Sequence, residues 1–127
     1  MLFDYQRTRF DTILDRLMAT LPDDLQQRLE EIPLIIDDEP PPHLLRKMKF
    51  DNNRTELCGL HWGTPLTHRS VLQTSRLPDR IMLFRGPIIR VTAHLASLED
   101  QIRITLLHEI GHHFGLDEDD LRRLGYG

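Results

Sequence analysis

The sequence predicts an α+β fold in which a small mixed β-sheet carries helices packed on it. Three short apolar runs have the length of strands and are bounded by Gly or Pro. The segments before and after them carry apolar residues at the three-and-four spacing of helices. The 127 residues have room for a single domain, residues 1–127, with a hydrophobic core of its own.

The first third of the chain predicts two helices and a strand. Residues 3–21 repeat apolar side chains at helical spacing, and Pro22 interrupts this helix. Residues 23–31 predict a shorter helical segment. The β-branched run 33–37 predicts the first strand, which ends before the rigid loop formed by Pro40-Pro41-Pro42.

The middle of the chain predicts two more strands. Residues 43–53 have the weakest pattern, which indicates a helical turn and an irregular connection. Residues 56–62 predict the second strand, and the polar residues 66–79 predict a mobile segment. Residues 80–85 predict the third strand. A helix follows, with Pro87 in its first turn, where a missing backbone N–H costs nothing.

The next helix carries the motif His108-Glu109-Ile110-Gly111-His112. Two imidazoles four residues apart point to the same side of a helix and can bind one zinc ion. Glu109 lies near the edge of that side, where its carboxylate can take a proton from water beside the metal. The sequence therefore predicts one Zn²⁺ as cofactor, with His108 and His112 as ligands and Glu109 as the catalytic base.

The surroundings of the motif predict a helix that is packed on its opposite side. Ser97 is the expected N-cap, and Gly115 is the expected helix stop. The reversal at Gly115 would bring the acidic run 117–120 toward the imidazoles, and residues 119–124 predict a last helical piece. His113 flanks the apolar side, so we expect it to be packed or hydrogen-bonded. The apolar stripe consists of Leu106, Leu107, Ile110 and Phe114.

Composition excludes several classes of protein. A net charge of −4 with a pI near 5.9 and no basic stripe argues against a nucleic-acid partner. No apolar run is long enough to cross a membrane, and no secretory signal is visible. The single Cys58 excludes an internal disulfide, so we expect a buried, inert thiol in a cytoplasmic protein.

Several segments resemble the small bacterial zincin-like family of zinc metallopeptidases. The likeness is strongest over Thr105-Leu-Leu-His-Glu-Ile-Gly-His-His-Phe-Gly-Leu116, and it extends to residues 59–67, 77–81 and 124–127. The resemblance implies a minimal zincin fold. It also implies hydrolysis of a peptide or amide bond in a peptide or protein substrate.

The same resemblance suggests the third zinc ligand and a substrate site. In the longer metzincin pattern a histidine follows the glycine by three residues, and Glu118 holds that place here, with Asp117 or Asp119 as the alternative. An edge strand beside the motif helix commonly binds an extended peptide in zinc peptidases. Residues 80–85 are our candidate for this strand, with Arg80, Met82 and Phe84 as the substrate-binding residues.

Two other readings stay open at this stage. Only nine residues follow Glu118, so the lower subdomain that metzincins carry after the motif is missing. That absence favours a non-catalytic zinc-binding or protein-interaction module of zincin fold. A zinc-dependent ribonuclease is the third reading, against which the acidic charge balance and Glu109 argue. The sequence does not indicate an oligomeric state.

Overall fold

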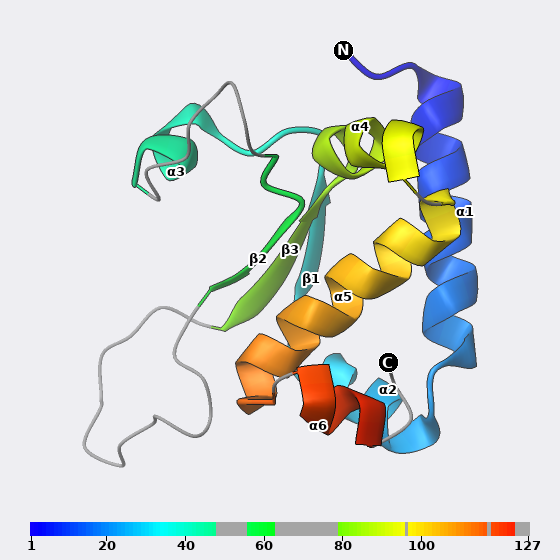
Figure 1. Cartoon of the computed structure of the whole chain (residues 1–127), viewed down its shortest axis with the longest axis vertical. Helices are drawn as coiled ribbons and strands as arrows, with labels where there is room; N and C mark the ends of the chain where they lie inside the picture. The colour runs from blue at the N-terminus through cyan, green and yellow to red at the C-terminus, as the bar shows by residue number, and fades with distance from the viewer. Residues whose placement is uncertain (48–55, 63–78, 96, 117, 124–127) are drawn as a thin grey trace.

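The computed structural model describes residues 1–47, 56–62, 79–95, 97–116 and 118–123. It confirms the α+β class, with a three-stranded sheet covered by helices (Figure 1). The strands are β1 (Leu34–Asp37), β2 (Gly59–Trp62) and β3 (Arg80–Phe84). The helices are α1 (Asp4–Thr20), α2 (Asp23–Glu30), α3 (Pro42–Lys47), α4 (Arg85–Leu95), α5 (Leu98–Phe114) and α6 (Glu118–Arg123).

Most predicted elements are present, with bounds shifted by a few residues. The proline cluster is not a loop throughout, because α3 begins at Pro42, where proline suits a first helical turn. The third strand ends at Phe84, one residue early, and α4 begins at Arg85. Of the segment 66–79, which is predicted to be mobile, residues 66–78 lie outside the described residues, as do 48–53.

The sheet is mixed and has the strand order β1-β3-β2. β1 runs parallel to β3, with Leu34 opposite Ile81, and β2 runs antiparallel to it, with His61 opposite the same residue. Both backbone edges of β3 are therefore occupied by neighbouring strands. The prediction that Arg80, Met82 and Phe84 bind a substrate on an edge strand is wrong, because β3 is the central strand.

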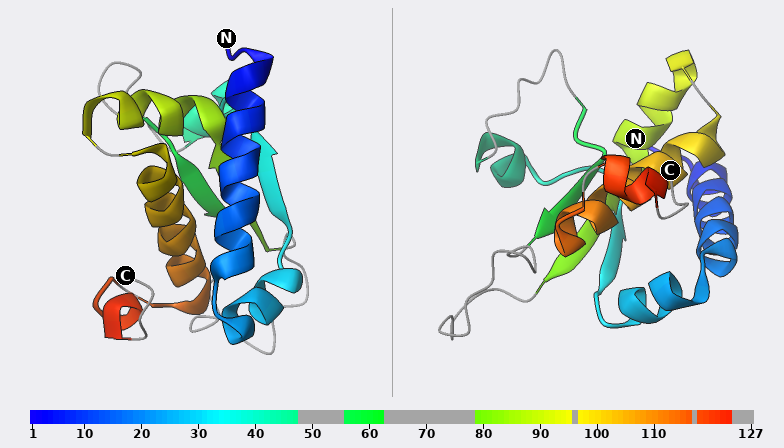
Figure 2. Two further views of the ribbon diagram at one scale, coloured as in Figure 1. Left: turned by 90° about the vertical axis from the view of Figure 1, so that its right-hand side faces the viewer. Right: turned by 60° about the horizontal axis from the view of Figure 1, so that its bottom comes forward.

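The two faces of the sheet bury different partners, as expected from the alternation of side chains along a strand. On one face, Ile81 and Leu83 of β3 join the main core with α1 and α5, which Figures 1 and 2 show lying over the sheet together with α4. On the other face, Met82 and Phe84 pack with Leu44 of α3. The main core is the larger of the two clusters. It contains the buried apolar residues of α5 and so holds this helix on the sheet.

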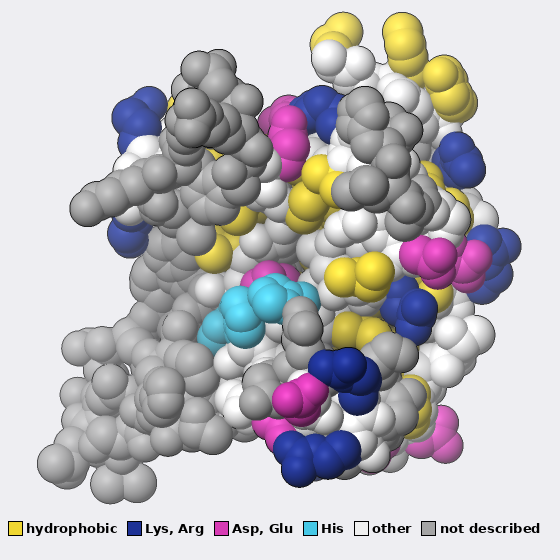
Figure 3. Space-filling view, in the orientation of Figure 1, with side chains coloured by type: hydrophobic (Ala, Val, Ile, Leu, Met, Phe, Trp, Pro, Cys, Tyr) yellow, Lys and Arg dark blue, Asp and Glu magenta, His cyan; other side chains and the backbone are white. Residues whose placement is uncertain are grey.

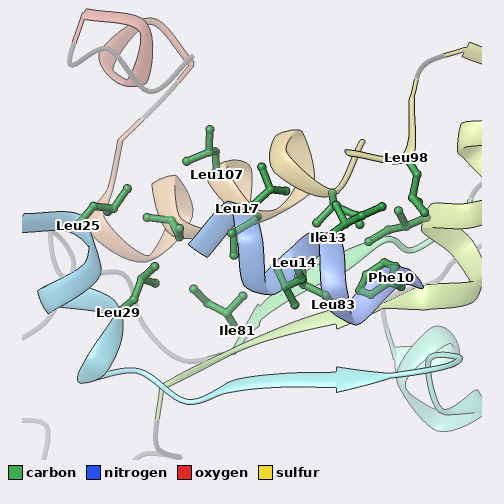
Figure 4. Packing of buried hydrophobic residues seen from close by; sticks show 14 of the residues in the cluster. Phe10, Ile13, Leu14, Leu17, Leu25, Leu29, Ile81, Leu83, Leu98 and Leu107 are labelled. Atoms are coloured by element: carbon green, nitrogen blue, oxygen red, sulfur yellow. The ribbon is translucent and has the colours of Figure 1, made fainter. Parts of the chain in front are cut away.

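Burial of apolar side chains fixes α5 in place (Figure 4). Its Ile102 and Ile110 have no exposed surface. Each such side chain contributes about 1.5–3 kcal/mol when it is fully buried. The partners from α1 are Phe10, Ile13, Leu14 and Leu17. The motif helix is thus a rigid part of the domain, as a metal site requires.

Both ends of α5 are capped as the sequence predicts. The Ser97 hydroxyl accepts a hydrogen bond of 3.1 Å from the Asp100 backbone N–H. Gly115 adopts the left-handed conformation with φ 71°. The next N–H, that of Leu116, donates to the Gly111 carbonyl at 2.7 Å, which completes a Schellman motif. These local contacts set where the helix begins and ends.

None of the helices in the described ranges is both long enough and apolar enough to cross a lipid bilayer.

Candidate metal centre

His108, Glu109 and His112 lie together on α5 and each offers one ligand atom. These three atoms all lie within 4.8 Å of one another. The two imidazole rings are arranged edge to face, with centroids 4.2 Å apart. Figure 3 shows histidine side chains gathered in one patch of the surface with acidic atoms beside them. The structure therefore assembles the motif as a compact donor cluster.

The imidazoles and the carboxylate differ sharply in exposure. The His112 side chain is 53% exposed, and His108 is exposed as well, whereas the Glu109 side chain is only 8% exposed. The helical positions of the motif predict that Glu109 faces outward with the histidines. This prediction is wrong, because β2 packs over Glu109: its Cγ lies 3.2 Å from the place that a Cβ would take at Gly59. The two imidazoles are therefore the solvent-exposed donors of the cluster, and Glu109 is its buried donor.

The environment of Glu109 favours a carboxyl that can accept a proton. Burial raises the pKa of the Glu109 carboxyl above its usual range. The positive potential of His108 and a hydrogen bond from the His61 backbone N–H act in the opposite direction. The carboxylate oxygen Oε1 also lies 3.5 Å from Nδ1 of His112. A raised pKa makes Glu109 a stronger base than an exposed glutamate, as general-base catalysis requires.

The predicted third ligand lies at the start of α6. This helix begins at Glu118, directly after the turn at Gly115, but the Glu118 side chain and all of Asp117 lie outside the described part of the structure. Asp119 is engaged elsewhere, since its Oδ1 accepts a 2.6 Å hydrogen bond from Arg122 and its side chain is 76% exposed. Glu118 therefore stays the predicted third ligand, with Asp117 or Asp119 as the alternative.

A second stripe of α5 faces β2 rather than solvent. Thr105, Glu109 and His113 follow one another at intervals of four residues, so they lie along one side of the helix. A Cβ at Gly59 would lie only 2.9 Å from the Thr105 Cγ2, which shows how closely the strand approaches. His113 is buried, 4% exposed, and its Nδ1 lies 3.0 Å from Nε2 of His61. The expectation that His113 is hydrogen-bonded in the interior is confirmed.

His61 is a residue of the site that sequence reasoning missed. Strand alternation places Gly59 and His61 on one face of β2 and Leu60 on the other. That pattern is visible in the sequence, but it does not reveal which face meets α5. The register settles this point, because Gly59 and His61 lie opposite Leu83 and Ile81, which belong to the helix-side core.

β2 has one edge that no described strand covers. The Phe84 N–H donates to the Cys58 carbonyl at 2.9 Å, and hydrogen-bonded pairs alternate along antiparallel strands. The backbone groups of Leu60 therefore point to β3, whereas those of Gly59 and His61 point away from it. Of these, the His61 N–H reaches Glu109. Among the described strands, the edge strand next to the donor cluster is thus β2.

Comparison with known proteins agrees with this site. No curated protein matches the chain. The family model of zincin-like metallopeptidases matches residues 29–127, which leaves α1 and the start of α2 outside the match. The matched part contains the whole sheet and the motif helix α5. The chain therefore belongs to the zincin-like metallopeptidase family.

Proposed function

We propose that this protein is a zinc-dependent peptidase that hydrolyses a peptide or amide bond, with Glu109 as general base. The observation that carries the proposal is the position of Glu109. Its buried carboxylate lies between two solvent-exposed imidazoles and the edge of β2 that no described strand covers. A base in that position can act on water beside a metal and on a peptide bound along the strand.

The donor set fits zinc. Imidazole nitrogens and carboxylate oxygens are among the usual ligands of zinc. His108 and His112 would each supply an imidazole nitrogen, and Glu118 would supply a carboxylate oxygen. Bound there, zinc would supply a Lewis acid for the substrate carbonyl and make water more acidic. Glu109 takes the proton of the attacking water at its carboxylate and then gives it to the leaving amine nitrogen.

The substrate strand follows from the topology. An extended peptide can add to a sheet edge through its backbone groups. The edge of β2 that no described strand covers presents the backbone groups of Gly59, and the His61 N–H beside them donates to Glu109. A peptide bound there would run beside His108, Glu109 and His112. We therefore propose β2, and not residues 80–85, as the strand that binds the substrate.

The test is a substitution of the base with a matched control. Zinc-loaded wild type, Glu109→Gln and Glu99→Gln are compared on a broad panel of quenched peptides, and zinc content is measured in parallel. Glu99 is an exposed glutamate in the first turn of the same helix. We expect Glu109→Gln to retain zinc and lose turnover by at least about 100-fold, with Glu99→Gln unchanged. Normal cleavage by Glu109→Gln would refute the assignment of the base.

The same experiment distinguishes the peptidase from a non-catalytic zinc-binding module. Chelator-sensitive cleavage by the wild type supports the peptidase. Zinc bound at His108 and His112 with no cleavage across the panel supports a non-catalytic zinc-binding module of zincin fold.

A further inference from the structure

The edge strand β2 is tied to the motif helix at two points by one residue. The backbone N–H of His61 donates to the Glu109 carboxylate. The side chain of the same residue reaches His113, with Nε2 and Nδ1 3.0 Å apart. Glu109 and His113 are four residues apart on α5. The two hydrogen bonds of His61 therefore join β2 to successive turns on one side of the helix.

The His113 imidazole is buried and the His61 imidazole is partly buried, so the pair lies between α5 and β2. The His113 side chain is 5% exposed, and the rings of His61 and His113 meet edge to face with centroids 5.0 Å apart. Asp79, which precedes β3, places its Oδ2 3.9 Å from the same Nδ1 of His113. A buried polar group is costly to leave without its hydrogen bond, so this pair favours one position of β2 over others.

We propose that His61 and His113 are positioning residues that hold the open edge of β2 in register with Glu109. This inference rests on the proposed peptidase function. The backbone groups of Gly59 would receive the substrate, and the neighbouring backbone N–H of His61 holds the base. A shift of β2 would therefore misplace the bound peptide and the general base together. The pair acts through β2 and touches neither substrate nor metal.

Conservative and apolar substitutions separate positioning from packing. An asparagine side chain can place a polar atom near the position of a histidine Nδ1, so His113→Asn can keep the bond to His61. His113→Leu fills the space of the imidazole but cannot form the hydrogen bond to His61. His43→Leu is the matched control, since His43 is exposed on α3 and belongs to neither core cluster. All three are studied as full chains with zinc added.

The first readout needs no substrate. Amide hydrogen exchange of the His61 N–H reports how often β2 leaves Glu109. We expect His113→Leu to speed this exchange about tenfold, the effect of one lost buried hydrogen bond, whereas His113→Asn and His43→Leu stay within about twofold. An unchanged His61 exchange rate in His113→Leu would overturn the proposal.

The second readout is kinetic. We expect KM for a cleaved peptide to rise about tenfold in His113→Leu and to recover in His113→Asn, with zinc content unchanged throughout. A purely structural pair would lower the unfolding free energy and leave KM and His61 exchange of the folded protein as they are. That result overturns the proposal. A wild type that cleaves no peptide overturns the peptidase function instead, and the exchange rate then decides the positioning role alone.

Discussion

The close approach of β2 to α5 at Gly59 predicts a specific energetic coupling. A Cβ at this position would lie 2.9 Å from the Thr105 Cγ2, 3.1 Å from the Met82 carbonyl oxygen and 3.2 Å from the Glu109 Cγ. Gly59→Ala must therefore push the strand or the helix aside, which costs about 1–3 kcal/mol. Alanine also lowers the conformational entropy of the unfolded chain, which stabilises the folded state by about 0.4–1 kcal/mol and offsets part of this cost. We expect a net loss of about 0.5–2 kcal/mol in unfolding free energy.

Thr105→Ser tests the origin of that loss. It removes Cγ2, the nearest of the three atoms, and keeps the hydroxyl that donates to the Gln101 carbonyl at 2.8 Å. By itself it should cost about 0.8 kcal/mol for one buried methyl group. In the Gly59→Ala background the missing methyl gives the new Cβ room. The double variant should therefore be more stable than the sum of the single losses, by about 1 kcal/mol.

The assay is urea unfolding followed by circular dichroism for the wild type, both single variants and the double variant. Equal slopes against urea would show that the four proteins unfold from comparable native states. Strict additivity of the two losses would refute the packing described here, because residues that do not touch show no coupling.

Three further predictions concern the helix stop, acid stability and the metal. Gly115→Ala forces an L side chain into a left-handed conformation at φ 71°, and urea unfolding should show a loss of about 1–2 kcal/mol. Burial raises the pKa of the Asp38 carboxyl, but hydrogen bonds from Arg7 and Arg85 outweigh it and hold that pKa below its usual range. Its stabilisation is therefore complete above the ordinary aspartate pKa of about 4 and disappears as the pH falls further; Asp38→Asn should flatten this acid limb in unfolding curves from pH 2 to 6. Zinc at about 100 times its Kd should stabilise the wild type by about 2.7 kcal/mol in thermal unfolding, and His108→Ala should abolish the gain; an equal gain in that variant would exclude His108 as a ligand.

The parts of the site that sequence reasoning predicted are those fixed by local chemistry. Ser97 and Gly115 bound the motif helix because a hydroxyl and a residue without a Cβ satisfy the ends of any helix. His108 and His112 meet because a helix brings residues four apart to one side. None of these conclusions needs knowledge of which other segment lies nearby.

The errors arise where a neighbouring strand decides the outcome. Residues 80–84 form a strand as predicted, but an apolar run reads the same in the centre of a sheet as at its edge. Only pairing with β1 and β2 shows that it is central. A parallel partner is joined by a long crossover, so β1 and β3 are far apart in sequence and their pairing leaves no local pattern.

Glu109 shows the functional consequence of this distinction. A helical wheel places it beside the exposed histidines, yet β2 covers it and gives it a backbone hydrogen bond, and the resulting burial raises the pKa of its carboxyl. The property that suits Glu109 to act as a base thus comes from the edge strand and not from the motif. Since Gly59 allows the close approach of β2 and the His61 backbone donates a hydrogen bond to Glu109, the segment Gly59–His61 belongs to the proposed active site as much as the motif does. A chain that kept the motif but carried a bulkier residue at position 59 would keep the imidazoles that could bind zinc while losing the environment of its base.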